Sequence, residues 1–310
     1  EFINADNAIL SVTRGEANRM LLFDSFRGEY FKENNSNLTT TLTVERLKQS
    51  PLGSLTFDYT ENGEPVSLDA IRTTEFGINL RFAPNANYFQ GKINRYPIFN
   101  KHPIFQFSYL GAYKGLLGST HAYHKLRFGV FKRFYLSFLG YTNVEFEAGK
   151  LFGKGIPYVL LHIPRANQSY TLQQRSFNMM NFLEFVSDEY VSFNVRYYMN
   201  GFIFNKIPLF KRLKLREIIS FKLLYGRISD DNNPEDNPDL IQLPKNTDGE
   251  QTTFTLENKP YMEGSVGISN IFKVITIDLV KRMTYLDQPN QANLFGVKGL
   301  GIRFRLGFEF

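Results

Sequence analysis

The clearest pattern in the chain is an alternation of apolar and polar residues with a period of two. The last segment alternates five apolar residues with three charged residues and one glycine, namely Ile302, Phe304, Leu306, Phe308 and Phe310 against Arg303, Arg305, Glu309 and Gly307. On a β-strand, residues i and i+2 point to the same face, so one face is apolar and the other is charged. Burying both faces in a soluble sheet would be costly. A strand with hydrocarbon on its apolar side and water on its charged side avoids this cost.

The same alternation recurs along the whole chain. Eight further segments follow it, at residues 38–44, 55–59, 76–82, 105–109, 126–130, 144–148, 191–197 and 275–279. Weaker candidates lie at residues 20–25, 157–162, 170–182, 215–226 and 261–268. Bacterial single-chain barrels have an even number of strands. The sequence therefore predicts an all-β fold, a transmembrane antiparallel up-and-down β-barrel of about 14 strands, within a range of about 12 to 16.

The connections between these strands are predicted to lie at two ends. Outer-membrane barrels have short turns on the periplasmic side and longer loops outside. If Phe310 lies at the periplasmic end, residues 83–101, 202–212 and 269–272 lie at that end as well. Residues 61–69, 229–259 and 286–293 then lie outside, which puts the long acidic segment 229–259 where a long loop is expected. The long connection 83–101 is the exception on the inner side.

Composition supports a membrane barrel rather than a soluble domain. The 310 residues include 31 Phe and 17 Tyr but no Trp and no Cys, and the mean hydropathy is only −0.27. A barrel can expose aromatic residues to lipid at alternate positions while its mean hydropathy stays that of a polar chain. No apolar run approaches the roughly 18 residues of a membrane-spanning helix. The absence of Cys argues against a disulfide-stapled domain and against thiolate chemistry.

We expect residues 1–310 to form a single outer-membrane β-barrel domain in the bacterial outer membrane. The chain opens at Glu1 without a starter Met or a signal-peptide pattern, so it is expected to be the C-terminal part of a longer polypeptide. The net charge of +6 arises from bases that are scattered rather than gathered in a stripe. Nucleic acid is therefore not an expected partner.

Several short motifs resemble a known family. They lie at residues 80–84, 88–91, 114–118, 123–126, 147–153, 177–188, 200–202, 206–209 and 266–273. These motifs resemble Gram-negative outer-membrane proteins of unknown function that carry an N-terminal carboxypeptidase-regulatory-like domain and a C-terminal barrel. The resemblance covers residues 54–310 and implies that this chain is the barrel part. The closing strands are also distantly similar to barrels that insert other outer-membrane proteins, although no convincing arginine-glycine-aromatic lumen loop is present.

Candidate catalytic and metal-binding residues are few. Of the four His residues, His121 and His124 would lie on opposite faces of a strand, which is not the geometry of a two-ligand motif. Ser119 beside His121 is similar to the hydroxyl and imidazole of outer-membrane lipases, but no orienting acid or amide has a supporting spacing. We therefore expect no catalytic residue, no cofactor and no metal. Outer-membrane lipase activity is a lesser alternative.

The acidic loop could hold calcium or could be a solvated surface. It contains Asp230, Asp231, Glu235, Asp236, Asp239, Asp248 and Glu250 against the single Lys245. Clustered carboxylates bind calcium when backbone carbonyls also turn inward. Three prolines and the lack of a ligand repeat favour a solvated loop, and calcium bridging to lipopolysaccharide phosphates is the alternative.

Charged residues at inward positions predict a charged lumen. Alternation places Lys125 and Arg127 on one strand facing Glu145 and Glu147 on its neighbour, and Arg303 and Arg305 also point inward. Cross-strand pairs of this kind contribute about 0.2–1 kcal/mol each and fix strand register. We therefore interpret them first as register-fixing pairs and second as a functional lumen lining.

Two further features predict contacts outside the chain. Lys206, Lys211, Arg212 and Lys214 are interleaved with apolar residues, which is typical of an anchor at the lipid interface; docking of another domain or subunit is the alternative. The terminal row Ile302, Phe304, Leu306, Phe308 and Phe310 resembles the signal by which the barrel assembly machinery recognises its substrates. Expected partners are thus outer-membrane lipid and lipopolysaccharide, that machinery, and subunits of a membrane complex.

Three functions are compatible with the sequence. The first is a barrel that acts as membrane anchor or scaffold for a periplasmic domain or partner complex, with a role in protein export or outer-membrane assembly. The second is a passive diffusion pore, which requires an open lumen. The third is an outer-membrane lipase-like enzyme, which requires a Ser, a His and an acid or amide within hydrogen-bond reach. We favour them in that order.

Overall fold

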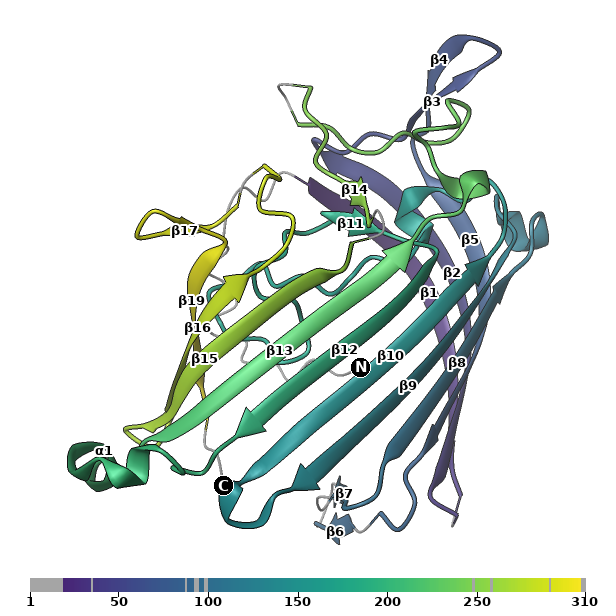
Figure 1. Cartoon of the computed structure of the whole chain (residues 1–310). Coiled ribbons are helices and arrows are strands. Elements are labelled where there is room, and N and C mark those ends of the chain that lie inside the picture. Colours follow the sequence, from purple (N-terminus) through teal and green to yellow (C-terminus); the bar gives the residue numbers. More distant parts are fainter. Residues whose placement is uncertain are drawn as a thin grey trace.

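A single antiparallel sheet of eleven strands dominates the computed structural model, which describes residues 19–34, 36–86, 88–91, 95–97, 100–246, 249–256, 259–289 and 291–307. Its strands follow one another in chain order (Figure 1). They are β1 (Arg19–Glu33), β2 (Leu38–Gly53), β5 (Ile71–Phe82), β8 (Ile104–Ala112), β9 (Tyr123–Tyr135), β10 (Tyr141–Phe152), β12 (Glu189–Tyr198), β13 (Arg216–Arg227), β15 (Tyr261–Ile271), β16 (Ile275–Arg282) and β19 (Leu300–Leu306). The predicted all-β, up-and-down architecture is confirmed.

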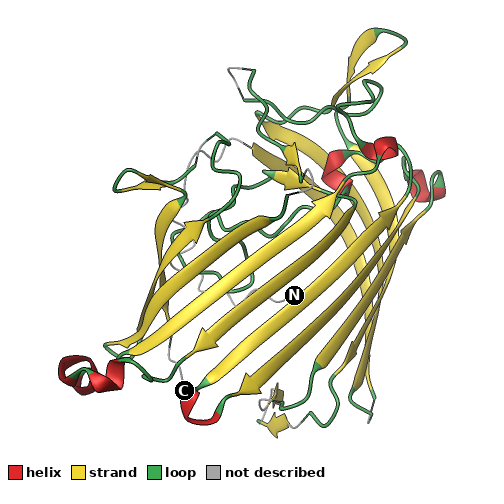
Figure 2. Ribbon diagram, in the orientation of Figure 1, coloured by secondary structure: helices red, strands yellow, loops and turns green. Residues whose placement is uncertain are grey.

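The remaining elements are short and lie in the connections (Figure 2). Four small pairs are β3 (Asp58–Glu61) with β4 (Glu64–Ser67), β6 (Tyr88–Gln90) with β7 (Arg95–Pro97), β11 (Phe185–Val186) with β14 (Phe254–Thr255), and β17 (Asn293–Leu294) with β18 (Val297–Lys298). The helical turns are η1 (Leu116–Gly118), η2 (Ser137–Leu139), η3 (Tyr158–Leu160), η4 (Phe204–Lys206), α1 (Pro208–Arg212) and η5 (Asp230–Asn232). In the described part of the chain, every helix is too short or too polar to cross a membrane.

Three of the predicted strands do not join the wall. Residues 157–162 form η3 and a single bridge instead of a strand, and residues 170–182 form turns and two isolated bridges, at Thr171 and Phe177. Residues 55–59 mostly precede the small hairpin β3–β4. In the first two segments the apolar residues are buried in consecutive runs, as Val159, Leu160 and Leu161 are, whereas a wall strand buries only every second residue. Leu55 and Phe57 alternate with more exposed neighbours, but they pack in the core cluster that contains Tyr158 and Leu160.

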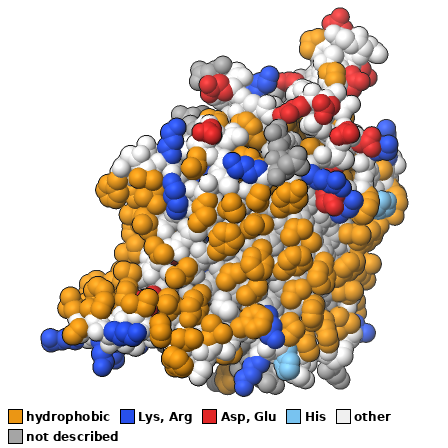
Figure 3. Space-filling view, in the orientation of Figure 1, with side chains coloured by type: hydrophobic (Ala, Val, Ile, Leu, Met, Phe, Trp, Pro, Cys, Tyr) orange, Lys and Arg blue, Asp and Glu red, His pale blue; other side chains and the backbone are white. Residues whose placement is uncertain are grey.

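The strands of the wall have two different faces. In β19, Phe304 is 42 % exposed on the outer face, whereas its neighbour Arg303 is 2 % exposed on the inner face. In β16, Leu279 is exposed and Asp278 is fully buried. Hydrophobic side chains cover the outer surface in a broad band between two charged ends (Figure 3). The predicted alternation of an apolar outer face with a polar inner face is confirmed.

The connections separate onto two ends of the sheet, as predicted. The described residues of the connections 83–103, 199–215 and 272–274 lie at the lower end in Figure 1, together with those of the turns at 34–37 and 136–140. The described residues of the connections 54–70, 113–122, 228–260 and 283–299 lie at the upper end, because an up-and-down sheet alternates its connections between two edges. The connection 153–188 begins and ends at this upper end. The tight turn after β15 contains Phe272 and Lys273 with positive φ angles of 50° and 69°.

The strand number and closure differ from the prediction as far as the described residues go. Eleven strands form the wall, against about 14 expected. β1 and β19 are the two edge strands of this sheet, and no pairing joins them within the described ranges. Closure and the final strand count therefore stay predictions.

Candidate functional site: an inner segment held by buried charges

The connection between β10 and β12 folds back against the inner face of the wall. We call residues 153–188 the inner segment. In Figure 1 it runs behind the strands β10 to β13 as a teal trace. Its apolar residues form the buried core of the molecule: one cluster contains Tyr158, Leu160 and Leu161, and a second packs Phe177 and Met180 against strand residues. The segment therefore fills part of the space that the curved sheet surrounds.

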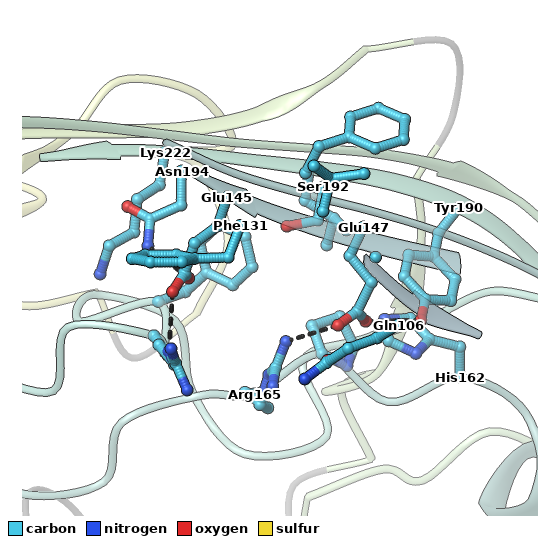
Figure 4. Close-up of a pocket in the computed structure, with 17 residues that line it drawn as sticks. Gln106, Phe131, Glu145, Glu147, His162, Arg165, Tyr190, Ser192, Asn194 and Lys222 are labelled. Atoms are coloured by element: carbon cyan, nitrogen blue, oxygen red, sulfur yellow. Dashed lines mark hydrogen bonds and ion pairs between the residues drawn. The ribbon is translucent and has the colours of Figure 1, made fainter. Parts of the chain in front are cut away.

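Two carboxylates of β10 bind arginines of the inner segment. Glu145 accepts a hydrogen bond from Nε of Arg175 at 2.7 Å, and Glu147 accepts one from Arg165 at 2.9 Å. The Tyr190 hydroxyl also donates to Glu147, at 2.7 Å. Figure 4 shows both glutamates pointing from the wall toward the segment. The space left there is about 80 Å³, which has room for only a few water molecules.

A second set of contacts joins the segment to β13 and β15. The buried Glu263 carboxylate accepts the backbone N–H groups of Asn178 at 2.8 Å and of Met179 at 3.0 Å. Lys222 donates to the backbone oxygen of Ser176 at 2.5 Å and lies 3.5 Å from Glu263. Because charge-assisted hydrogen bonds in a dry site are strong, this buried pair fixes the backbone of the segment in one position.

A third contact is the buried ion pair between Arg282 of β16 and Glu184 of the segment. Their nearest atoms are 2.6 Å apart. The Arg282 guanidinium also donates to the backbone oxygens of Thr284 at 2.9 Å and Tyr285 at 2.7 Å. Asn181 donates its backbone N–H to the same Glu184 carboxylate at 2.7 Å. Both charges are thus satisfied inside the molecule, as buried ions require.

The inner segment also pairs with the edge of the last wall strand. The Leu172 N–H donates to the Phe304 oxygen at 2.6 Å, and the Phe304 N–H donates to the Tyr170 oxygen at 3.0 Å. The adjacent Arg303 donates to the backbone oxygen of Asn178, at 3.1 Å from Nε. An edge strand otherwise offers unpaired backbone groups. The segment therefore occupies part of the free edge of β19 from inside.

The predicted pairing of Lys125 and Arg127 with Glu145 and Glu147 is wrong. The strands β9 and β10 are neighbours, and all four residues line cavities at the inner face. However, the register places Arg127 opposite Gly149, not opposite a glutamate. The two glutamates instead find their partners on the inner segment, because long arginine side chains reach them from across the cavity.

The other predicted residues lie in three places. Arg303 and Arg305 are on the inner side of β19, and Ile302, Phe304 and Leu306 alternate with them. Phe308 and Phe310 lie outside the described residues. Lys206, Lys211, Arg212 and Lys214 lie at η4 and α1 in the β12–β13 connection. They are next to exposed apolar side chains such as Leu209 and Leu213.

Residues singled out for chemistry are engaged in other ways. The Ser119 hydroxyl donates to the backbone oxygen of His121, not to its ring. In the acidic loop, Asp231 pairs with Lys154 at 3.1 Å and Glu235 accepts from the Gln251 amide at 2.7 Å. Across the residues whose positions are described, no group of three or more His, Asp or Glu has a metal-binding arrangement.

Sequence reasoning missed the inner segment. Its buried runs, residues 157–161 and 177–186, are apolar without a period of two. That loss of alternation is the signal that could have separated it from the wall. Its charged partners could not be found this way, because Glu184 and Arg282 are 98 positions apart.

Comparisons with known proteins agree with this fold. The chain is similar to BamA from Haemophilus ducreyi lacking POTRA domains 1-3, with a TM-score of 0.54 and 10% sequence identity. The match covers 94% of this chain and 55% of the BamA chain, so this chain spans about half the length of that structure. A family model described as "Family of unknown function (DUF5686) C-terminal domain" matches residues 24–232. Curated protein sequences contain no match.

Proposed function

We propose that this chain, which belongs to the family of unknown function DUF5686 through its C-terminal domain, is an outer-membrane β-barrel with an occupied interior. The barrel anchors other protein parts. In this proposal the sheet closes into a barrel with an even number of strands, as outer-membrane barrels do. The barrel carries a periplasmic domain or partner complex. Its interior is a docking chamber for the inner segment and not a diffusion path.

The two faces of the wall support a position in the membrane. Outward residues such as Phe304, Val266 and Leu279 are exposed and apolar, whereas inward positions hold buried charges. This outer apolar band is far larger than the apolar patches of ordinary soluble proteins, and in water it would promote aggregation. In hydrocarbon it is the lipid-facing surface of the barrel.

The lower end supports an orientation with that end in the periplasm. It carries most of the short turns, which outer-membrane barrels place there. The basic cluster, defined as Lys206, Lys211, Arg212 and Lys214, lies there just beyond exposed Leu209 and Leu213. Basic groups beside apolar groups suit the boundary between anionic headgroups and acyl chains. The upper end, with the acidic loop, then faces outward toward lipopolysaccharide.

The inner segment is the observation that carries the preference for an anchor over a pore. Its contacts reach β10, β13, β15, β16 and β19, so it crosses the inner face of half the wall. These contacts use buried charges, whose loss is costly. A segment held in this way does not leave the lumen freely, and a passive pore gains nothing from it.

A role in export or outer-membrane assembly is supported by the last strand. Its closing pattern resembles barrels that insert other outer-membrane proteins, and the fold is similar to that of BamA. The edge of β19 pairs with the inner segment at Phe304. When the inner segment undocks, this edge can pair with another strand, which a strand paired on both sides cannot do. The assembly machinery remains the proposed reader of the C-terminal row.

Single-channel conductance of the reconstituted chain tests this function. We expect the native chain to show no steady wide-pore conductance, and Glu184→Gln to produce open events because it breaks the buried pair with Arg282. Glu189→Gln, at an exposed pair with Arg227, is the matched control and should behave as native. A large, stable conductance of the native chain that Glu184→Gln does not change would refute the occupied interior.

Cell fractionation tests the anchor role separately. A periplasmic reporter placed ahead of residue 1 should sediment with the outer membrane. Recovery of the reporter in the soluble or inner-membrane fraction, with the barrel itself intact, would contradict an anchor.

A further inference from the structure

A second cavity lies near the upper end, between the inner faces of β8 to β10 and the first part of the inner segment. Its volume is about 270 Å³, more than three times that of the space beside Glu145 and Glu147. The side chains that matter for its chemistry are those of Ser108, Lys125, Arg127, His162, Asp188 and Tyr190. It is large enough for several water molecules or for a small hydrated solute.

Two cations line this cavity without an acidic partner. Lys125 and Arg127 form no ion pair with a carboxylate, within the part of the chain that is described. The charge of Glu75 acts on Lys125 from a greater distance, and the Glu75 carboxylate accepts the Tyr123 hydroxyl. The ammonium of Lys125 lies 5.0 Å from the ring centre of Tyr123. The acids that could have met them, Glu145 and Glu147, are bound by arginines of the inner segment. Docking of the segment therefore leaves two positive charges facing the cavity.

The other groups of the cavity do not cancel these charges. The Oδ2 atom of Asp188 accepts hydrogen bonds from the Ser229 N–H at 2.9 Å and from the Asn232 amide at 3.1 Å, so this carboxylate is held by the neighbouring loop. His162 stacks on Tyr190 with 3.3 Å between ring centres. Burial, with the nearby cations Arg165, Arg127 and Lys125, lowers the pKa of His162 well below its ordinary value. This shift favours the neutral imidazole. The third cation of the lining, Lys150, pairs with Glu189 at 3.3 Å, so Lys125 and Arg127 exceed the single carboxylate of Asp188.

We propose that this cavity binds a small soluble oxyanion of the phosphate class. The guanidinium of Arg127 can form two parallel hydrogen bonds to such an anion, and Lys125 supplies a point charge. The Ser108 hydroxyl is a further neutral donor. Lys125 is half-buried and Arg127 is exposed toward the inner side of the sheet, so both charges can be reached by an anion dissolved in water. The cavity opens on the inner side of the sheet, opposite the apolar outer face, so the occupant arrives from water and not from the bilayer.

Titration calorimetry with inorganic phosphate tests this site. The chain is folded in a nonionic detergent, at low ionic strength because salt screens such contacts. We expect the double variant Lys125→Gln and Arg127→Gln to bind phosphate at least tenfold more weakly, which is about 1.4 kcal/mol. Arg127→Lys keeps the charge but loses the paired donors, and its loss should be intermediate. Arg133→Gln removes another cation of β9, one that donates to Asn143, and should leave binding unchanged.

The outcomes separate this site from the alternatives. Equal phosphate affinity in the native chain and the double variant, or an equal loss in Arg133→Gln, overturns the proposal. A parallel titration with short-chain phosphatidylglycerol distinguishes a lipid headgroup: binding of that lipid without binding of phosphate also overturns it. Circular dichroism shows whether each variant keeps its β-sheet, and Arg127→Lys tests the site if a glutamine variant does not fold. The result is independent of the conductance experiment, so either proposal can fail alone.

Discussion

The buried pair between Glu184 and Arg282 should control whether the inner segment stays docked. The two side chains are 3 % and 0 % exposed and lie 2.6 Å apart. Glu184→Gln keeps the shape but removes the negative charge, and it leaves the buried Arg282 guanidinium with only neutral partners, including the backbone oxygens of Thr284 and Tyr285. Breaking such a pair costs about 3–5 kcal/mol. At about 1.4 kcal/mol per factor of ten, undocking becomes more favourable by roughly two to three and a half orders of magnitude.

The absence of Cys from the sequence makes this effect directly measurable. Met180→Cys places one thiol in the buried core of the segment, where the native Met180 is fully buried. A maleimide reaches this thiol only when the segment undocks, so the labelling rate follows the undocked population. We expect Glu184→Gln to raise that rate by on the order of a hundredfold or more in the same thiol background.

The matched control uses the same substitution at an exposed pair. Glu189 and Arg227 lie 2.7 Å apart, but their side chains are 38 % and 68 % exposed. Pairs of this kind contribute about 0–1 kcal/mol, so Glu189→Gln should change the labelling rate by less than about fivefold. If Glu184→Gln left the rate unchanged, or if Glu189→Gln raised it equally, the buried pair would not be what holds the segment.

Three further outcomes are expected. Leu172→Pro removes the N–H that the Phe304 oxygen accepts, so hydrogen exchange at β19 should become faster while exchange at β9 stays the same; unchanged protection of β19 would contradict the edge pairing. Replacing Lys211 and Lys214 with Gln should weaken binding to phosphatidylglycerol vesicles several-fold but not to neutral vesicles, and equal losses on both would refute a headgroup anchor. Deleting Phe310 should lower insertion into the outer membrane, and unchanged membrane yields would count against an assembly signal.

The sequence by itself determined the two faces of the wall. Alternation is a local property, because each side chain of a strand points opposite to its neighbours whatever the rest of the chain does. The outward position of Phe304 and the inward position of Arg303 follow from this rule alone. The separation of the connections onto two ends follows equally from counting strands in an up-and-down order. For these features no long-range information was needed.

Only the tertiary structure decided which groups meet inside. Glu145 and Arg175 are 30 positions apart, and Glu184 and Arg282 are 98 apart, so no local pattern connects them. The register prediction for Lys125 and Arg127 failed because alternation fixes the face of a residue but not its partner across the strand pair. The inner segment supplied other partners for the glutamates. A buried charge needs a partner of opposite charge or a hydrogen-bond partner. Which residue becomes that partner depends on the path of the whole chain.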